Sequence, residues 1–396
     1  AFIRSVDKEI ERVHSLTDRQ LASVAGELRD EIASQQAGDA MLPRGFALAA
    51  EAARRVLGFQ LYSVQLYASK ILASGAIAEM ATGEGKTLSA VPATVVRALY
   101  GAGVHIATPN SYLAERDHEQ LAPVYELLGL TTAFLPEKAD PSEKVAAYQA
   151  DITFGTGYEF GFDYLRDQLA LRSASLSQLG SNLIAQLLGD APSAPTAQRG
   201  LAFSIVDEAD NVLIDDASSP LILSEVPAGD AVDAAAVKTA LAISQELKLD
   251  VDYLIKPGRV ELTPAGKQRI HREDVSIPVK QLRRPWAGYV EQALHARMNV
   301  LRDVHYVIDD DEVQLVDATT GRIFADRSWQ DGLHQAVQAK EGLGISPESH
   351  ILAEITRQRF YRLYGRLAGM TGTAENCQRE LKMVYATPLI PVPLRS

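Results

Sequence analysis

Along the first part of this chain, hydrophobic residues recur with the spacing of an amphipathic helix. Roughly the first 35 residues place their apolar side chains on one helical face, and Thr17 with Gln20 forms a capping-box pattern within them. Gly38 and Pro43 are predicted to break this pattern, because neither residue suits the interior of a helix. The same periodicity resumes from 46 to 57.

Short apolar strands then alternate with helices. A helical pattern spans 111–128, and the clearest strand candidates around it are 76–78, 104–107 and 151–154. This alternation is the βαβ rhythm of a parallel sheet, so an α/β fold is predicted. Pro92 lies inside the helical pattern 88–100, where it should kink the helix or displace its start.

A second unit is predicted to begin near Ser224, where the alternation of strands and helices ends. Its segment 230–247 has a helical pattern. The runs 305–308 and 312–316 alternate around an acidic turn, which indicates a hairpin. The mixed order predicts an α+β domain inserted into the parallel-sheet domain.

The first candidate for a functional site is the glycine-rich run that follows the predicted strand 76–78. Gly83 and Gly85 allow backbone N–H groups to turn toward phosphate oxygens, and the following helix N-terminus adds a partial positive charge. Lys86 can reach the β- and γ-phosphates, and Thr87 offers a hydroxyl to Mg²⁺. Met80 stands at the first glycine position of the strict phosphate-loop pattern. The run alone therefore leaves open a glycine-rich turn with a solvated lysine.

Two carboxylates at the end of a buried strand strengthen the nucleotide interpretation. The strand candidate 202–206 is followed by Asp207 and Glu208. Asp207 would hold Mg²⁺, directly or through water, opposite Thr87, and Glu208 would orient and deprotonate the attacking water. Taken singly, such a pair is more often a solvated turn. After a phosphate loop, it predicts a RecA-like motor domain that hydrolyses ATP.

Composition and charge narrow the function classes. At 396 residues, of which 46% are hydrophobic, the chain should form two or more folded units with well-filled cores. Its net charge of −12 lacks the basic footprint of a duplex-binding protein, although a local basic groove is still compatible with it. The single cysteine, Cys377, fits a reducing compartment. No apolar stretch approaches a membrane span and no secretory signal pattern opens the chain, so we expect a cytosolic protein that touches a membrane only peripherally.

Seven runs of this sequence resemble motifs of SecA, the bacterial preprotein translocase ATPase, and they occur in the family's order. They are Ile77–Thr87, Thr108–Asp117, Thr153–Thr156, Gly161–Asp167, Val206–Asp210, Asp331–Val337 and Ala368–Ala374. The resemblance covers nearly the whole chain, and its later motifs occur in few other ATPases. It implies a RecA-like, parallel-sheet P-loop motor domain that is interrupted by an inserted α+β preprotein cross-linking domain.

The resemblance also implies domain boundaries. The first nucleotide-binding domain, with its N-terminal helices, would take residues 1–223 and resume at 354–388. The preprotein cross-linking domain, a clamp that holds an unfolded substrate, would take residues 224–353. Residues 389–396 would begin the linker to a second motor domain. The alternative for the insert is a passive domain without a substrate.

Site residues follow from the same resemblance. Gln65 is expected to contact the adenine edge, because an amide supplies both a donor and an acceptor. The expected ATP-binding residues are Gln65, Gly83, Glu84, Gly85, Lys86 and Thr87, and the expected catalytic residues are Glu208, Asp207 and Lys86. Mg²⁺ would lie between Thr87 and Asp207. The turn Thr371-Gly372-Thr373 would communicate the nucleotide state to the neighbouring domain through its hydroxyls and flexible glycine.

The implied function is that of an ATP-driven motor subunit, which couples ATP hydrolysis to preprotein export across the cytoplasmic membrane. ATP and Mg²⁺ are the expected cofactors, and no zinc site is expected in this chain. The expected partners are preproteins, the Sec membrane channel and an acidic phospholipid surface, but not nucleic acid. The protein would be cytoplasmic and peripheral on the inner face of the membrane. Two alternatives remain, an RNA helicase-like superfamily 2 ATPase and a nucleotide-sensing module without turnover.

Several features depart from the family pattern. Ala1 is not a start methionine and the chain ends after Pro388, where the family enters its second motor domain, so a piece of a longer protein is expected. The arginines of that second domain have no counterpart here, and we expect weak ATP hydrolysis by this chain alone. Ser218 replaces a family arginine, Tyr158 replaces an asparagine, and 168–200 is interpreted as a partly helical surface insertion. These departures predict an accessory SecA paralogue, with a divergent housekeeping copy as the alternative.

Overall fold

The computed structural model describes most of the chain, namely residues 1–34, 41–177, 196–225, 231–272, 275–309, 311–316, 323–324, 328–373 and 377–394. Side chains are described over the same ranges except 174–177, 281 and 323–324. The chain divides into two compact units. Unit 1 comprises Ala1–Leu223 and Leu352–Ser396, and unit 2 comprises Ser224–Ile351.

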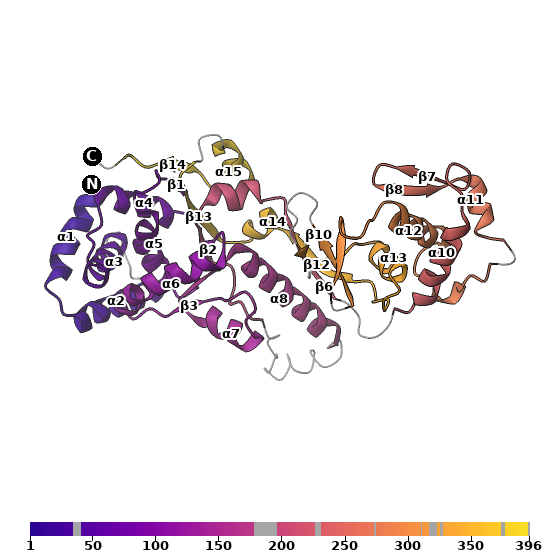
Figure 1. Cartoon of the computed structure of the whole chain (residues 1–396). Helices are drawn as coiled ribbons and strands as arrows, with labels where there is room; N and C mark the ends of the chain where they lie inside the picture. The colour runs from indigo at the N-terminus through magenta and orange to yellow at the C-terminus, as the bar shows by residue number, and fades with distance from the viewer. Residues whose placement is uncertain are drawn as a thin grey trace. The chain divides into compact units, whose positions relative to one another are not determined.

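A seven-stranded sheet, in which every neighbouring pair is parallel, forms the centre of unit 1 (Figure 1). In spatial order its strands are β14 (Leu389–Pro391), β1 (Ile77–Glu79), β13 (Arg366–Thr371), β5 (Phe203–Val206), β2 (Val104–Thr108), β4 (Ile152–Thr156) and β3 (Thr132–Phe134). The sheet confirms the predicted α/β fold. Its order also places β13, which follows unit 2 in the sequence, between β1 and β5.

Helices cover both faces of this sheet (Figure 1). They are α1 (Phe2–His14), α2 (Asp18–Ala33), α3 (Met41–Leu57), α4 (Ser63–Ala73), α5 (Lys86–Ala98), α6 (Ser111–Glu126), α7 (Pro141–Gln149), α8 (Gly157–Ser177), α14 (Arg357–Tyr361) and α15 (Gln378–Tyr385), with one π-helical turn at Asn211–Asp215.

Two hydrophobic cores lie on opposite faces of the sheet, because successive residues of a strand point to opposite sides. On one face, Ile106 and Ile205 pack with residues of helices α1 to α6. On the other face, Ala107 and Val206 pack with residues of α7, α8, α14 and α15. Since both faces are covered, the residues of the central strands are buried on both sides, including the polar residues His105, Thr153 and Ser204.

The N-terminal helices differ from the prediction in their breaks. The first helical stretch is two helices, α1 and α2, and the second begins at the capping box of Thr17 and Gln20. Pro43 does not break the pattern, which corrects the prediction. It lies in the first turn of α3, where a missing N–H costs no helical hydrogen bond. Pro92 lies inside α5 and does not displace the start of that helix, which is at Lys86.

Unit 2 combines helices with antiparallel hairpins. Its helices are α10 (Ala234–Glu246), α11 (Pro264–Arg269), α12 (Trp286–Met298) and α13 (Leu333–Lys340), with a 3₁₀ turn at Val279–Gln281. Its strands are β7 (Tyr253–Lys256), β8 (Arg259–Leu262), β9 (Tyr306–Asp309), β10 (Glu312–Val316) and β11 (Ile323–Phe324). The hairpin predicted around the acidic turn is present as the pair β9 and β10. Strands β6 (Pro220–Glu225) and β12 (His350–Thr356) form a two-stranded sheet where the chain passes between the units.

The predicted surface insertion is described only at its two ends. Helix α8 continues through its first part to Ser177. The leucines at 179, 183 and 187, which carry the rest of the helical prediction, lie outside the described residues. At the other end, Asp167 accepts hydrogen bonds from the backbone N–H groups of Ala197 (2.7 Å) and Gln198 (3.0 Å). The returning chain is thus fixed to α8 by one carboxylate.

A buried carboxylate ties the N-terminal helices together. Glu51 in α3 is only 1% exposed, and its carboxylate accepts hydrogen bonds from Arg54 (2.8 and 2.9 Å) and Arg55 (2.7 Å). The ring of His14 in α1 lies 3.3 Å from the same carboxylate, and Arg55 also donates to the carbonyl of Leu16 at 2.7 Å. Burial raises the pKa of Glu51, but the hydrogen bonds from Arg54, Arg55 and His14 outweigh it and lower the pKa to about 2.

We expect Glu51→Gln to lower the free energy of unfolding at neutral pH by roughly 1–3 kcal/mol, because it removes charge-assisted hydrogen bonds. The pKa of Glu51 is lowered by folding, so its contribution is complete above its unfolded value of about 4.3 and is lost as the pH falls toward 2. Urea unfolding at about pH 7 and about pH 3 measures both effects. Glu11→Gln, an exposed carboxylate on α1, is the control. A Glu51→Gln protein with the wild-type pH dependence would contradict this role.

Candidate nucleotide-binding site

The phosphate-loop candidate connects the end of β1, at Glu79, to the start of α5, at Lys86. Gly83 and Gly85 have φ angles of 87° and 81°, in the left-handed region that favours glycine. A Cβ added at Gly85 would lie 2.5 Å from Nε2 of Gln65, so a larger residue there would displace the end of the Gln65 side chain. The loop leads directly into the N-terminus of α5, where the helix dipole is positive.

Gln65, in the first turn of α4, holds this loop from the side. Its Nε2 donates to the carbonyl oxygen of Glu84 at 3.0 Å, and its Oε1 accepts from the backbone N–H of Tyr62 at 3.0 Å. The side chain is buried. These bonds use one of its two N–H groups and one of its two lone pairs, so a donor and an acceptor remain for a ligand. Its contact with adenine stays a prediction.

Asp207 and Glu208 follow β5 directly. The N–H of Asp207 donates to the carbonyl of Ala107 in β2 at 2.8 Å, which extends the ladder by one residue. Glu208 has a φ of 46°, which residues other than glycine rarely adopt. At this turn the Glu208 carboxylate meets Lys86, whose Nζ donates to Oε1 at 2.8 Å. One ion pair thus joins the phosphate loop to the end of β5.

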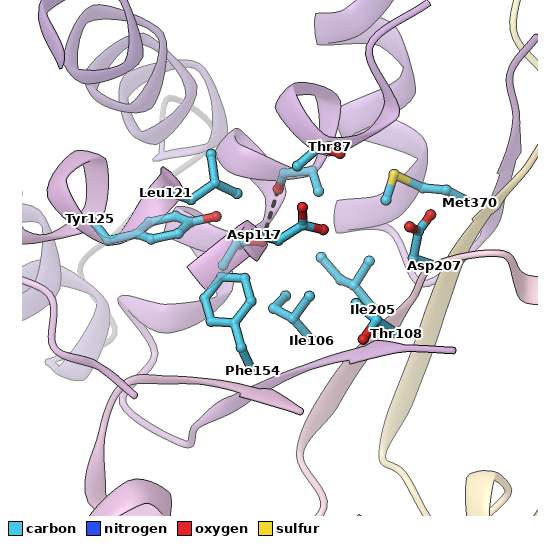
Figure 2. A pocket seen from close by; sticks show the side chains of 12 residues that line it. Thr87, Ile106, Thr108, Asp117, Leu121, Tyr125, Phe154, Ile205, Asp207 and Met370 are labelled. Carbon is cyan, nitrogen blue, oxygen red and sulfur yellow. Dashed lines mark hydrogen bonds between the residues drawn. The ribbon is translucent and has the colours of Figure 1, made fainter. Parts of the chain in front are cut away.

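Asp207 faces a small cavity that Thr87 also lines (Figure 2). Its Oδ1 is buried and has no hydrogen-bond partner within the described part of the chain. Burial, and then the neighbouring charge of Glu208, raise the pKa of Asp207 to about 6, although Lys86 acts in the opposite direction. A buried carboxylate oxygen without a donor is costly, so a cation or an ordered water would stabilise this position.

The turn after β13 reaches the phosphate loop. The carbonyl of Thr371 accepts from the N–H of Met80 at 2.8 Å. A Cβ added at Gly372 would lie 3.4 Å from the hydroxyl oxygen of Thr82 and 3.8 Å from Nζ of Lys86. The turn thus lies against both the phosphate loop and the lysine.

The same turn also contacts the segment after β5. The hydroxyl of Thr373 donates to the carboxylate of Asp210. Burial raises the pKa of Asp210, but hydrogen bonds from Thr373 and Thr371 outweigh it and lower the pKa below its usual range. The phosphate loop, the two carboxylates after β5 and the turn after β13 are thus brought together at the carboxyl ends of three neighbouring strands.

Sequence comparison relates this chain to known proteins. The family model described as the SecA DEAD-like domain matches residues 1–382. Protein translocase subunit SecA 2 of Mycolicibacterium vanbaalenii is 41% identical over 99% of this chain and 44% of its own length. Protein translocase subunit SecA is 38% identical in Nitrosococcus oceani, over 99% of this chain and 43% of its own length, and 39% identical in Acinetobacter baumannii, over 96% and 42%. This chain belongs to the SecA family.

The SecA-family chain spans less than half the length of these relatives. A solved structure of S. tokodaii Xpd4 covers 85% of the chain with a TM-score of 0.28 and 11% sequence identity, which is too little structural agreement to bear on the fold. Among the described residues, no helix is both long and apolar enough to cross a membrane. The same residues contain no group of three or more His, Cys, Asp or Glu that could hold a metal ion.

Reasoning from the sequence assigned no role to three residues that lie close to this SecA-family site. Asp210 binds the turn after β13, and Asp117 with Arg116 lies beside Asp207. All three belong to the runs that carry the resemblance. Their position in the sequence could have identified them as candidates, because each residue follows the carboxyl end of a strand. Residues from neighbouring parallel strands lie close together at that edge of a sheet.

We expect Asp207→Asn to stabilise the protein at neutral pH, in the absence of added nucleotide, by roughly 1–3 kcal/mol. The pKa of Asp207 is raised by folding, so the folded state loses stability as the pH rises from the unfolded value of about 3.9 through about 6. The amide carries no charge and avoids this loss.

Urea unfolding at about pH 8 and about pH 4 tests this expectation, since the difference between the two proteins should shrink at the lower pH. Asp215→Asn, an exposed carboxylate after the same strand, is the control. If Asp207→Asn is no more stable than the wild type at about pH 8, the buried charge of Asp207 does not destabilise the folded state.

Proposed function

We propose that this chain is part of an ATP-driven motor subunit of the Sec translocase, which couples ATP hydrolysis to preprotein export across the cytoplasmic membrane. The observation that carries the proposal is the convergence of Lys86, Asp207 and Glu208 at the carboxyl edge of a parallel sheet. The relatives named as protein translocase subunits support the same function. Unit 1 is then the first nucleotide-binding domain, and its enzyme activity is ATP hydrolysis.

Lys86 binds the β- and γ-phosphates in this proposal, and the α5 N-terminus and the N–H groups of Gly83, Glu84 and Gly85 surround them. A phosphate that takes the Lys86 ammonium competes with Glu208, whose carboxylate accepts from Nζ at 2.8 Å. Phosphate binding therefore frees Glu208 to act as the base that orients and deprotonates water. The same contact links nucleotide binding to the activation of the base.

Thr87 and Asp207 fit a magnesium ion bound with the nucleotide. A hydroxyl and a carboxylate are the hard oxygen ligands that Mg²⁺ prefers, and it takes its remaining ligands from phosphates and water. The Oδ1 of Asp207, buried without a donor, supports this assignment. When bound, the ion would neutralise charge that develops on the phosphates. No zinc ion is part of the proposal.

Gln65 is assigned to the adenine edge through the donor and acceptor that its loop contacts leave unused. The turn Thr371-Gly372-Thr373 is assigned to coupling. Its position against Thr82 and Lys86 supports this role, because the turn contacts both the phosphate loop and Asp210.

Unit 2, together with the adjoining residues up to 353, is assigned to the preprotein cross-linking domain, which holds an unfolded preprotein. The partners in this proposal are preproteins, the Sec membrane channel and an acidic phospholipid surface. The protein would be cytoplasmic and peripheral on the inner face of the cytoplasmic membrane. We assign no role in nucleic-acid binding, which the net charge of −12 supports.

Two other functions use the same site. An RNA helicase-like ATPase would share the motor, and a nucleotide sensor would bind without turnover. An ATPase assay of the complete protein with added preprotein, membrane vesicles or RNA separates them. Stimulation by preprotein and vesicles supports the translocase, stimulation by RNA alone supports the helicase, and binding without turnover supports the sensor.

We also infer an accessory paralogue, with a divergent housekeeping copy as the alternative, from the departures at Tyr158 and Ser218 together with the insertion at 168–200. Tyr158, in the position of a family asparagine, donates from its hydroxyl to Glu137, and the guanidinium of Arg357 lies 6.0 Å from its ring centroid. Arg357 also pairs at 2.8 Å with Asp216, which precedes Ser218, the position of the family arginine, by two residues in the sequence. An arginine from a later segment thus supplies a positive charge near the position of the missing one.

We expect Lys86→Ala to abolish productive nucleotide binding while the fold stays intact. The lysine supplies a charge-assisted contact to phosphate, whereas glycine geometry and helix packing hold the loop. Calorimetric titration with ATP, with circular dichroism as a check on folding, measures the effect. Lys138→Ala, an exposed lysine of unit 1, is the control. Wild-type affinity in the Lys86 variant would refute the assigned role.

We expect Glu208→Gln in the complete protein to bind ATP but to hydrolyse it about 10²- to 10⁴-fold more slowly. Glutamine keeps the shape of the side chain but cannot accept the proton of the attacking water. Single-turnover hydrolysis measures the rate, and calorimetry measures the binding. Turnover at the wild-type rate would mean that another residue is the base.

A further inference from the structure

The cavity between α5, α6 and the sheet is lined by one carboxylate, Asp117, to which the proposed nucleotide site assigns no role. Its volume of about 20 Å³ leaves room for roughly one water molecule. Figure 2 shows the carboxylate of Asp117 projecting from α6 into this space, with Thr87 and Asp207 also on its walls. Most of the remaining lining is apolar and includes Ile106, Leu121, Phe154, Ile205 and Met370.

Asp117 is nearly completely buried, with 4% of its surface exposed. Arg116 donates to its Oδ1 from both Nε (3.0 Å) and Nη2 (2.6 Å), and about half of the arginine side chain is exposed. No hydrogen bond among the described residues involves the second oxygen, Oδ2. Arg116 therefore fixes one oxygen from the solvent side and leaves the other without a protein donor.

A purely structural ion pair does not explain this arrangement well. Asp117 is only 4% exposed, and its second oxygen makes no hydrogen bond within the described part of the chain, although this oxygen is not fully enclosed by protein atoms. The cavity beside Asp117 is also lined by Asp207, whose Oδ1 is buried without a partner. Two carboxylate side chains and four hydroxyl side chains, those of Thr87, Thr94, Thr108 and Tyr125, thus line a cavity the size of a water molecule.

We propose that Asp117 is a positioning residue for the magnesium ion of the nucleotide site. Its Oδ2 accepts a hydrogen bond from a water bound to the metal that Thr87 and Asp207 hold, and Arg116 fixes the orientation of the carboxylate. Mg²⁺ keeps several of its waters in protein sites, and a carboxylate that accepts from such a water stabilises the bound ion. The inference rests on the proposed nucleotide function and adds a residue to it.

Calorimetric titration of the 396-residue chain with ADP, in excess Mg²⁺ and in EDTA, tests this role. Asp117→Asn keeps an oxygen for Arg116, but its NH₂ group cannot accept from a water. We expect this variant to bind ADP in Mg²⁺ about 10-fold more weakly than the wild type, with unchanged affinity in EDTA. Glu119→Gln, which removes an exposed carboxylate from the same helix, should change neither value.

A second variant keeps the test decisive if Asp117→Asn does not fold. Arg116→Lys changes a half-exposed side chain and keeps its charge, but it loses the two-donor contact. We expect a smaller loss of affinity that is again confined to Mg²⁺. Wild-type behaviour of a folded Asp117→Asn protein, equal losses in Mg²⁺ and EDTA, or an unaffected Arg116→Lys protein would each overturn the inference. Absence of any ADP binding by the wild type would overturn the proposed nucleotide function itself, and this inference with it.

Discussion

Strand β13 occupies the position between β1 and β5, although the whole of unit 2 separates it from β5 in the sequence. Its register pairs Gly369 with Ile77 on one side and with Val206 on the other. A Cβ at Gly369 would lie 2.8 Å from the Cβ of Ala209 and 3.1 Å from the carbonyl oxygen of Val206, so the strand fits only because this residue is glycine. Without β13, the phosphate loop after β1 and the carboxylates after β5 would not share one sheet edge. The insertion of unit 2 is therefore compatible with the site only because the chain returns to this position.

The charged residues at the carboxyl edge of the sheet destabilise the folded state. Asp207 is buried with an unpartnered oxygen, and Glu208 adopts a backbone conformation that is rare outside glycine. Lys86 partly compensates both carboxylates, and Asp210 is stabilised by the hydroxyl of Thr373. Such strain is common where a protein keeps polar groups ready for a ligand. Positive φ angles also occur at other non-glycine residues, including Asp250, Asp331 and Ala386, whereas at Glu208 the strained backbone directly follows a buried carboxylate oxygen without a partner.

The buried charges around Lys144 are paired with one another and serve the fold. Lys144 in α7 is buried and donates to Glu159 at 2.9 Å and to Asp163 at 2.7 Å, and the hydroxyl of Tyr148 donates to the second oxygen of Asp163. Both environments are buried, but Oδ1 of Asp207 has no hydrogen-bond partner in the described part of the chain, whereas both oxygens of Asp163 accept hydrogen bonds. A buried carboxylate oxygen without a partner is therefore a clearer indication of a candidate ligand site than burial alone.

Sequence by itself determined the elements and the chemistry of this protein. The apolar runs of β2 and β4, the glycines of the phosphate loop and the acidic pair after β5 follow from local spacing and residue type, which need no knowledge of distant contacts. The sequence pattern predicted a helix that begins at 46, whereas α3 begins at Met41. Pro43 therefore lies in the first turn of α3, where proline is tolerated.

Only the tertiary structure shows which carboxylates lie close together. Asp117 lies far from Asp207 in the sequence, and the two line one cavity because β2 and β5 are neighbours, so that α6, which follows β2, packs beside the end of β5. The pairing of Lys86 with Glu208 and the contact of Gly372 with the phosphate loop have the same origin. Strand order is set by the packing of whole faces against each other, and a local pattern carries no information about which strands become neighbours.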